Sequence, residues 1–192
     1  MDLRCFIALE IPRDIKASLS FMLDRLKKSG ADIKWLADDN IHLTLKFLGN
    51  TEDALIEPLK KSLSKKISFY NQFYITITGT GSFPDKRHPR VIWAGIQEPS
   101  LLKRLQKEVE DVTAELGFPA EKKEFSPHLT LGRVRSQRRV VEALKILDEF
   151  ATYKFGEAEI NSIVLMKSEL KPGGAQHTCL AEIFFNRRSN VR

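Results

Sequence analysis

The tetrapeptide His-Leu-Thr-Leu occurs twice in this chain of 192 residues, at 42–45 and at 128–131. The chain contains only four histidines, so chance does not easily supply two copies that each include one. The copies are 86 residues apart, and a fixed shift of this kind indicates an internal repeat. We therefore predict two structurally similar lobes related by a pseudo-twofold axis.

The same shift carries other segments onto each other without gaps. It moves Ala8, in a short β-type run, onto Ala94 in a second such run. It also aligns two amphipathic helical patterns, placing Ile15 on Leu101. Any two amphipathic helices share their apolar spacing, so the helices carry less weight in this argument than the tetrapeptides.

Apolar periodicity and turn residues predict alternating strands and helices along the chain. We expect the second strand to end in a turn at Gly49-Asn50, and we expect segment 79–89 to be the most loop-like internal stretch. A further turn is expected at 171–174. The predicted strands are 4–10, 41–48, 73–80, 90–96, 128–134, 158–167 and 178–186, and the predicted helices are 12–29, 52–69, 99–117 and 136–151.

This pattern predicts an α+β fold, because strands and helices are interspersed and no flexible linker separates the halves. We expect one bilobal domain spanning residues 1–192. Each lobe should contain a mainly antiparallel sheet backed by helices, with the active-site groove between the lobes.

Alternation along a strand gives each tetrapeptide a polar face. His42 and Thr44 should point to one side of their strand, and Leu43 and Leu45 to the other. The second copy repeats this arrangement with His128 and Thr130. A single strand of this kind is more often a half-buried sheet segment, but two copies at equivalent points of a repeat favour catalysis.

Two imidazoles and two hydroxyls facing one groove suit phosphoryl transfer at a cyclic diester. One neutral imidazole can accept a proton from water while a protonated one donates to the departing ribose oxygen. Threonine hydroxyls can donate hydrogen bonds to the phosphate oxygens. Threonine is a poor zinc ligand, and no cysteine or carboxylate cluster accompanies the histidines, so we expect no metal and no cofactor.

The chain resembles the two-histidine (2H) phosphoesterase superfamily, in particular its LigT-like branch of RNA 2′,3′-cyclic phosphodiesterases, which are also called 2′-5′ RNA ligases. The resemblance is carried by the two tetrapeptides with their flanking residues and by several shorter segments: Arg4–Leu9, Trp35, Asn40–Gly49, Gly81–Pro84, Arg90–Gly95, Phe125–Arg133 and Ser168–Leu170.

This resemblance implies opening of a 2′,3′-cyclic phosphate to a 2′-phosphate, with the 3′ oxygen leaving. It implies that His42 is the general acid and His128 the general base, while Thr44 and Thr130 bind phosphate. The symmetry of the sequence does not by itself decide which histidine plays which part.

Arg133 matches an arginine that the family often carries after its second motif, where it can bind phosphate or ribose. By strand parity Arg133 should point with the leucines, so a strand end or a bulge is needed to turn it into the groove, and a surface arginine is the plain alternative. Parity likewise predicts that Lys46 is exposed on the histidine side and that Phe47 lies in the core.

Two other histidines have weaker claims to a function. His177 stands where many relatives have tyrosine, which puts any base-stacking role there in doubt. His88 is expected to be a loop residue, in a basic stretch at 86–90 that could bind RNA phosphates.

The bulk properties fit a protein that binds nucleic acid. The formal net charge of +6 favours a polyanionic partner, although a solvated basic surface is the plain alternative. Cys5 and Cys179 are expected to be buried, reduced thiols. No apolar run reaches membrane-spanning length, so we expect a cytoplasmic monomer with no membrane association that acts on RNA or nucleotides.

Two other functions stay open at this stage. The same histidines could join a 5′-hydroxyl end to a cyclic phosphate through a 2′-5′ bond, because the reaction is reversible. Alternatively, the chain could be a nucleotide- or RNA-binding module that has lost catalysis, which the two complete tetrapeptides argue against.

Overall fold

A computed structural model describes residues 2–97, 100–172 and 174–186. In chain order its elements are β1 (Asp2–Glu10), α1 (Arg13–Lys28), β2 (Ile33–Trp35), η1 (Asp38–Asn40), β3 (His42–Glu52), η2 (Asp53–Leu55), α2 (Ile56–Ile67), β4 (Phe73–Phe83), β5 (Val91–Gln97), α3 (Ser100–Glu115), β6 (His128–Val134), α4 (Val140–Glu149), β7 (Lys154–Ile160), β8 (Ser162–Lys171) and β9 (Gly174–Phe184).

The strands form one antiparallel sheet whose order is symmetric about its centre. The order is β7-β4-β5-β6-β3-β1-β8-β9, with β2 added beside β6. Strands β3 and β6, which carry the tetrapeptides, are the central pair, and β1 and β5 are their outer neighbours. The predicted α+β class, antiparallel sheet and paired lobes are confirmed.

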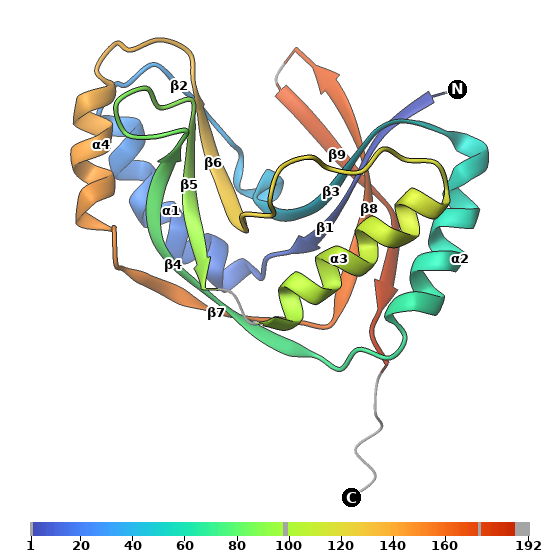
Figure 1. Cartoon of the computed structure of the whole chain (residues 1–192). Helices are drawn as coiled ribbons and strands as arrows, with labels where there is room; N and C mark the ends of the chain where they lie inside the picture. The colour runs from blue at the N-terminus through green and yellow to red at the C-terminus, as the bar shows by residue number, and fades with distance from the viewer. Residues whose placement is uncertain (1, 98–99, 173, 187–192) are drawn as a thin grey trace, which may run out of the picture.

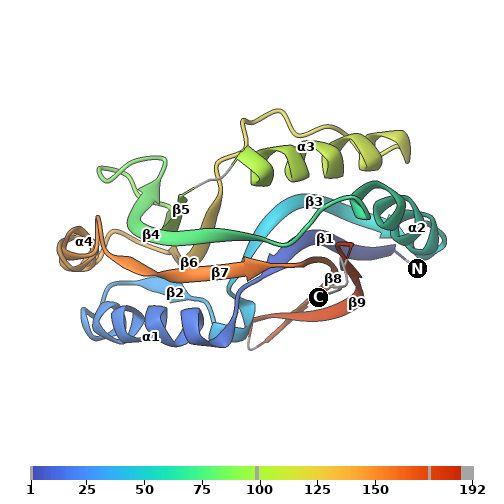
Figure 2. The ribbon, with the colours of Figure 1, turned by 90° about the horizontal axis from the view of Figure 1, so that it is seen from below.

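The helices cross over between the lobes. Helix α1 packs against β7 and α4, which come from the second half of the sequence, whereas α3 packs against α2 and β3 from the first half. Figures 1 and 2 show the two helix pairs on opposite sides of the molecule. Each lobe is therefore assembled from both halves of the chain, a feature that the repeat alone did not reveal.

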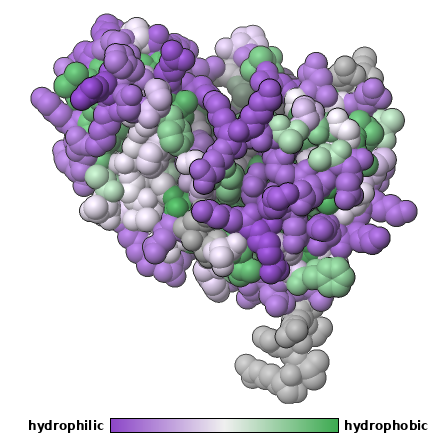
Figure 3. Space-filling model, viewed as in Figure 1, coloured by the Kyte–Doolittle hydropathy of each residue, from purple (hydrophilic) through white to green (hydrophobic). Residues whose placement is uncertain are grey.

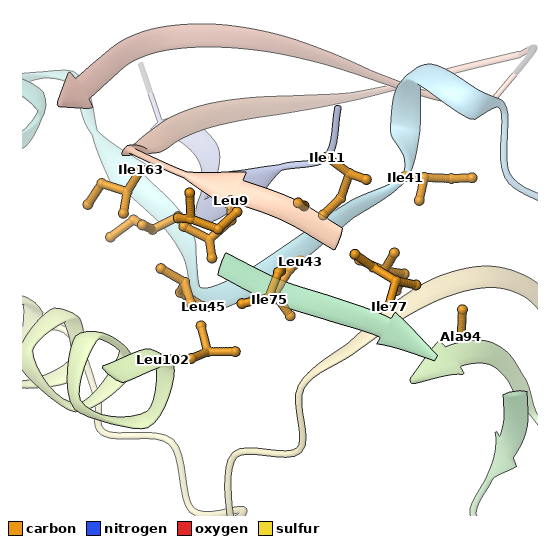
Figure 4. Close-up of a cluster of buried hydrophobic side chains, with 14 of the residues drawn as sticks. Leu9, Ile11, Ile41, Leu43, Leu45, Ile75, Ile77, Ala94, Leu102 and Ile163 are labelled. Carbon is orange, nitrogen blue, oxygen red and sulfur yellow. The ribbon is translucent and has the colours of Figure 1, made fainter. Parts of the chain in front are cut away.

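The sheet curls around the main hydrophobic core. In Figure 4, Leu43 and Leu45 from β3 lie beside Ile75 from β4, although these strands are not neighbours in the sheet. All three side chains are buried. Burial of this apolar surface supplies the main driving force for folding and fixes the inner face of β3.

The helical part of the repeat is confirmed at most positions. Leu19 of α1 and Leu105 of α3, which are 86 residues apart, are both fully buried. The expected pairing of Ile15 with Leu101 is wrong, because Leu101 is exposed and its neighbour Leu102 is buried instead.

For strands β1 and β5, the predicted shift of 86 residues is wrong by one residue. Ile7 pairs with Lys46 at the same point of the β1–β3 ladder at which Ile92 pairs with Gly132 in the β5–β6 ladder. Strands β1 and β5 are therefore related by a shift of 85 in their pairing, while β3 and β6 keep the shift of 86. Ala8 corresponds to Trp93 and not to Ala94.

Several predicted boundaries are wrong for local reasons. Strand β3 runs through Gly49, whose φ of 71° serves a bulge in the ladder and not a chain reversal. Strand β4 extends to Phe83, so the loop-like segment begins later than expected. The single strand expected at 158–167 is two strands, β7 and β8, at different places in the sheet.

The helix bounds also differ at their ends. A short η2 turn precedes α2, and α4 begins at Val140 and not near 136. The turn expected at 171–174 lies where β8 meets β9, with Lys171 paired to Gly174. Pro99 and Gly173, which belong to predicted elements, lie outside the described residues.

The two cysteines differ from each other. Cys5 is a buried free thiol, as expected, whereas Cys179 is a free thiol on the exposed part of β9, so its predicted burial is wrong. Among the described residues, no helix is long and apolar enough to cross a membrane.

Candidate active site

The two tetrapeptides lie side by side at the centre of the sheet. Leu43 pairs with Leu129 across β3 and β6, and both leucines are buried. Because the strands are antiparallel, this register sets His42 opposite Thr130 and sets Thr44 opposite His128, on the face away from the leucines. The structure thus brings together the four residues that the sequence predicted.

Matching bulges alter the side-chain alternation beyond each tetrapeptide. Leu45 is skipped in the β1–β3 ladder, and Leu131 is skipped in the β5–β6 ladder. The bulge turns Arg133 to the histidine side of β6, where it lines a cavity with Thr130. Of the two explanations that strand parity allowed for Arg133, a strand end or a bulge, the bulge is present.

The equivalent bulge in β3 overturns two predictions. Phe47 is 62% exposed and lines the cavity, although parity placed it in the core. Lys46, expected on the exposed side, is buried. One extra residue reverses the faces of the side chains that follow it, up to the second bulge beside Gly49.

A cavity of about 890 Å³ opens beside the two strands. The described residues that line it include no aspartate or glutamate. On the face seen in Figure 3, hydrophilic residues cover most of the surface. The cations in the cavity lining are Arg4, Lys27, Lys34, Arg133 and Lys171. Such a lining favours an anionic ligand.

His42 lies between aromatic rings in the cavity. Its ring stacks on Phe6 at a centroid distance of 4.7 Å and lies 5.3 Å from the ring of His177. Burial lowers the pKa of His42 to about 4, and the nearby His177 and Lys16 act in the same direction. In the free protein, His42 is therefore neutral at physiological pH.

His128 is half-buried and is held by a backbone contact. Its Nδ1 lies 2.7 Å from the carbonyl oxygen of Ser126, and its ring meets Phe83 edge-on at 4.9 Å. Burial lowers the pKa of His128, and the positive charge of Arg133 adds to this effect. The cavity lining includes Thr130, two residues along the same face of β6, but not His128 itself.

The two threonines are free to act on a ligand. Neither the Thr44 nor the Thr130 hydroxyl makes a hydrogen bond to another described residue, and both residues line the cavity. In the described part of the chain, no group of three or more histidine, cysteine, aspartate or glutamate residues could hold a metal ion. His88 lies in an exposed loop, as expected, and is not among the cavity residues.

The sequence reasoning did not assign Phe6 and His177 to the site. Phe6 belongs to a small buried cluster with Ala8 and Val164 on the cavity side of β1. Strand alternation could have indicated this, because Ile7 and Leu9 face the main core. His177 reaches the site from β9, the outermost strand of its lobe, and only the tertiary fold brings it there.

A curled antiparallel sheet with two histidine–threonine pairs on one face of its central strands defines a two-histidine phosphoesterase. The sequence matches the family model described as "LigT like Phosphoesterase" over residues 9–93 and 95–175. The chain belongs to this family.

Known relatives are similar over nearly the whole length. An RNA 2′,3′-cyclic phosphodiesterase of Methanothermobacter thermautotrophicus is 30% identical, covering 96% of this chain and 99% of the relative. The protein of that name from Aquifex aeolicus is 37% identical, covering 87% and 91%. The crystal structure of TT0787 of Thermus thermophilus matches with a TM-score of 0.81 and 26% identity, covering 94% of this chain and 97% of that one.

Proposed function

We propose that this protein hydrolyses the 2′,3′-cyclic phosphate at RNA ends to a 2′-phosphate, with His42 and His128 as its proton-transfer residues. The observation that carries the proposal is the Leu43–Leu129 pairing, which sets two histidine–threonine pairs beside a cationic cavity. The names of the relatives support the choice of RNA 2′,3′-cyclic phosphate as substrate.

The proposed step is a single displacement at phosphorus. A water molecule attacks the phosphorus atom and gives up one proton to a neutral histidine, for which we propose His128. The bond between phosphorus and the 3′ oxygen breaks, and that oxygen takes a proton from a protonated histidine, for which we propose His42. Solvent then restores both protonation states.

The other residues of the site suit the charge of the phosphate. The hydroxyls of Thr44 and Thr130 can donate hydrogen bonds to its non-bridging oxygens, and the Arg133 guanidinium can bind one or two of them. These donors are already in position before the reaction, so they stabilise the developing charge without costly reorganisation.

The acid role of His42 requires a change in its protonation on binding. In the free protein, the low pKa of His42 leaves its ring neutral. A bound phosphate places a negative charge beside the ring and favours the imidazolium form. We therefore propose that substrate binding raises the pKa of His42, so that its ring takes from solvent the proton that the leaving oxygen later receives.

The direct test is incubation with an oligonucleotide ending in a 2′,3′-cyclic phosphate, with a chelator present. The expected product is the 2′-phosphate, because the 3′ oxygen leaves in the proposed step, and the chelator should have no effect because two histidines transfer the protons. Activity that disappears with the chelator alone would contradict the proposed step. Tight binding without turnover at any pH would support the binding-module alternative.

Adding a 5′-hydroxyl oligonucleotide to the same assay tests the ligase alternative. Hydrolysis should remain the main reaction, since water is the more abundant nucleophile. A 2′-5′-linked product in excess would favour ligation. The single-domain organisation over residues 1–192, the monomeric state and the cytoplasmic location stay predictions.

A further inference from the structure

A buried ion pair joins the strand of the first tetrapeptide to the segment that leads into the second. The Lys46 ammonium donates to Glu110 Oε2 at 2.6 Å and to the Pro119 carbonyl oxygen at 2.7 Å. The Lys46 side chain is 3% exposed and that of Glu110 is 14% exposed. Lysine is almost never buried unless it is paired, so the contact is a specific feature of this fold.

The pair connects β3 to two parts of the chain that are distant from it in sequence. Lys46 lies in β3, Glu110 lies in α3, and Pro119 lies in the irregular segment 116–127 between α3 and β6. The carboxylate of Glu110 also accepts from the Glu121 backbone N–H at 3.4 Å. Lys46 and Glu110 therefore anchor the beginning of the segment whose far end carries His128.

That far end controls the orientation of the histidine. The Ser126 carbonyl lies 2.7 Å from His128 Nδ1, so movement of the segment would move the partner that holds the ring. The residue equivalent to Lys46 in the second strand is Gly132, which has no side chain. The other half of the repeat thus has no matching anchor at this position.

We propose that Lys46 and Glu110 are positioning residues, which set His128 by fixing segment 119–127 from the opposite lobe. The proposal rests on the proposed function, since it concerns the accuracy with which His128 meets the substrate. A displacement of about 1 Å in a reacting group can cost on the order of 100-fold in rate. Substrate binding should change little, because neither side chain lines the cavity.

The test replaces both charged residues together with methionine, as the double variant Lys46→Met/Glu110→Met. Replacing a buried pair by apolar residues of similar volume is often neutral for stability, whereas removing one partner leaves an unpaired buried charge. We expect the double variant to fold, its kcat to fall about 100-fold and its KM to change less than about threefold. Hydrogen exchange at the Glu121 amide, which donates to Glu110, should rise.

A matched control comes from the surface of α2. Lys60 and Glu57 form an ion pair with the same 2.6 Å distance, but both residues are far more exposed. The double variant Lys60→Met/Glu57→Met should keep wild-type kcat and wild-type exchange at the Glu121 amide. Equal losses in both double variants would overturn the proposal.

A second variant covers the case in which the first double variant does not fold. Glu110→Gln removes the charge but keeps an oxygen acceptor for Lys46, and we expect a smaller fall in kcat together with faster exchange at the Glu121 amide. Wild-type kcat and exchange in a folded variant would overturn the proposal. Inactive wild-type protein would instead contradict the proposed function, so the two failures are distinguishable.

Discussion

Phe47 and Arg133 occupy equivalent positions in the repeat, 86 residues apart, and both line the cavity because each of their strands skips one residue just before them. The bulges therefore give the two lobes the same geometry but different chemistry. One lobe presents an exposed aromatic ring, and the other presents a guanidinium. The backbone of the site is therefore symmetric, but its side chains are not. This asymmetry suits a substrate whose two sides differ chemically.

Replacing Arg133 with alanine should lower kcat/KM about 10-fold to 100-fold, because a charge-assisted hydrogen bond to phosphate is lost. Arg133→Lys should recover part of the loss, since it keeps the charge but not the planar fork. Steady-state kinetics on a cyclic-phosphate oligonucleotide measure both variants. Arg138→Ala, which changes an exposed arginine outside the cavity lining, is the control. Equal kinetics for Arg133→Ala and wild type would remove this residue from the site.

The threonines can be tested by changing only their hydroxyl groups. Thr44→Val and Thr130→Val keep the side-chain shape and should each lower kcat/KM about 10-fold to 100-fold, because one donor to the phosphate is missing. Thr44→Ser and Thr130→Ser should retain most of the activity. Thermal unfolding should be similar in all four variants, since neither hydroxyl bonds to another described residue. Full activity in both valine variants would show that the phosphate is bound elsewhere.

The protonation of His42 can be followed directly by NMR of its ring signals. We expect a midpoint at about pH 4 in the free protein, because burial disfavours the charged ring. Inorganic phosphate should raise this midpoint. A free-protein midpoint at 6.5 or above would contradict the proposal that substrate binding is needed to protonate His42.

The same pKa shift predicts how stability depends on pH. The unfolded chain binds a proton at His42 near pH 6.5, whereas the folded chain does so only near pH 4. Between these values the unfolded state binds more protons, so the free energy of unfolding falls as the pH is lowered through this window. Urea titrations at pH 7 and pH 5 should show a smaller decrease in His42→Gln than in wild type. An equal decrease in both proteins would show that His42 does not contribute.

The buried pair of Leu43 and Leu129 at the centre of the sheet should contribute strongly to the free energy of unfolding. Leu129→Ala removes a fully buried side chain and should lower the free energy of unfolding by about 2–5 kcal/mol. Val141→Ala, at a residue that is 62% exposed on α4, should change it by less than about 0.5 kcal/mol. Chemical denaturation measures both. A small effect at Leu129 would mean that the centre of the sheet tolerates a cavity.

The sequence predicted the site well where a pattern stayed local. The bounds of β6 were predicted as 128–134, and the two histidines and two threonines were assigned to one face of their strands. A repeat with a rare residue in each copy carries this information without any knowledge of the fold. A bulge or a strand end before Arg133 is also expected from the sequence, because the resemblance places this arginine on the opposite side of its strand from that given by parity.

The errors arise where tertiary structure overrides alternation. The bulge at Leu45 exposes Phe47 and buries Lys46, and no local signal in the sequence marks it. The partners of Lys46 are 64 and 73 residues away, so its burial depends on how α3 crosses between the lobes. His177 also lies beside His42 only because of the tertiary fold. It comes from the outer strand β9, and no pattern in the sequence connects that strand to the site.

The central claim is that His42 and His128 act on one phosphorus atom, and phosphorus NMR of a 2′,3′-cyclic nucleotide tests it most directly. With wild-type protein, the cyclic phosphate signal should convert to that of a 2′-phosphate. His42→Ala and His128→Ala should each slow the conversion by at least about 100-fold, since each removes one proton-transfer group. His88→Ala, at an exposed loop histidine, should convert the substrate at the wild-type rate. Undiminished conversion in either His42→Ala or His128→Ala would contradict the account.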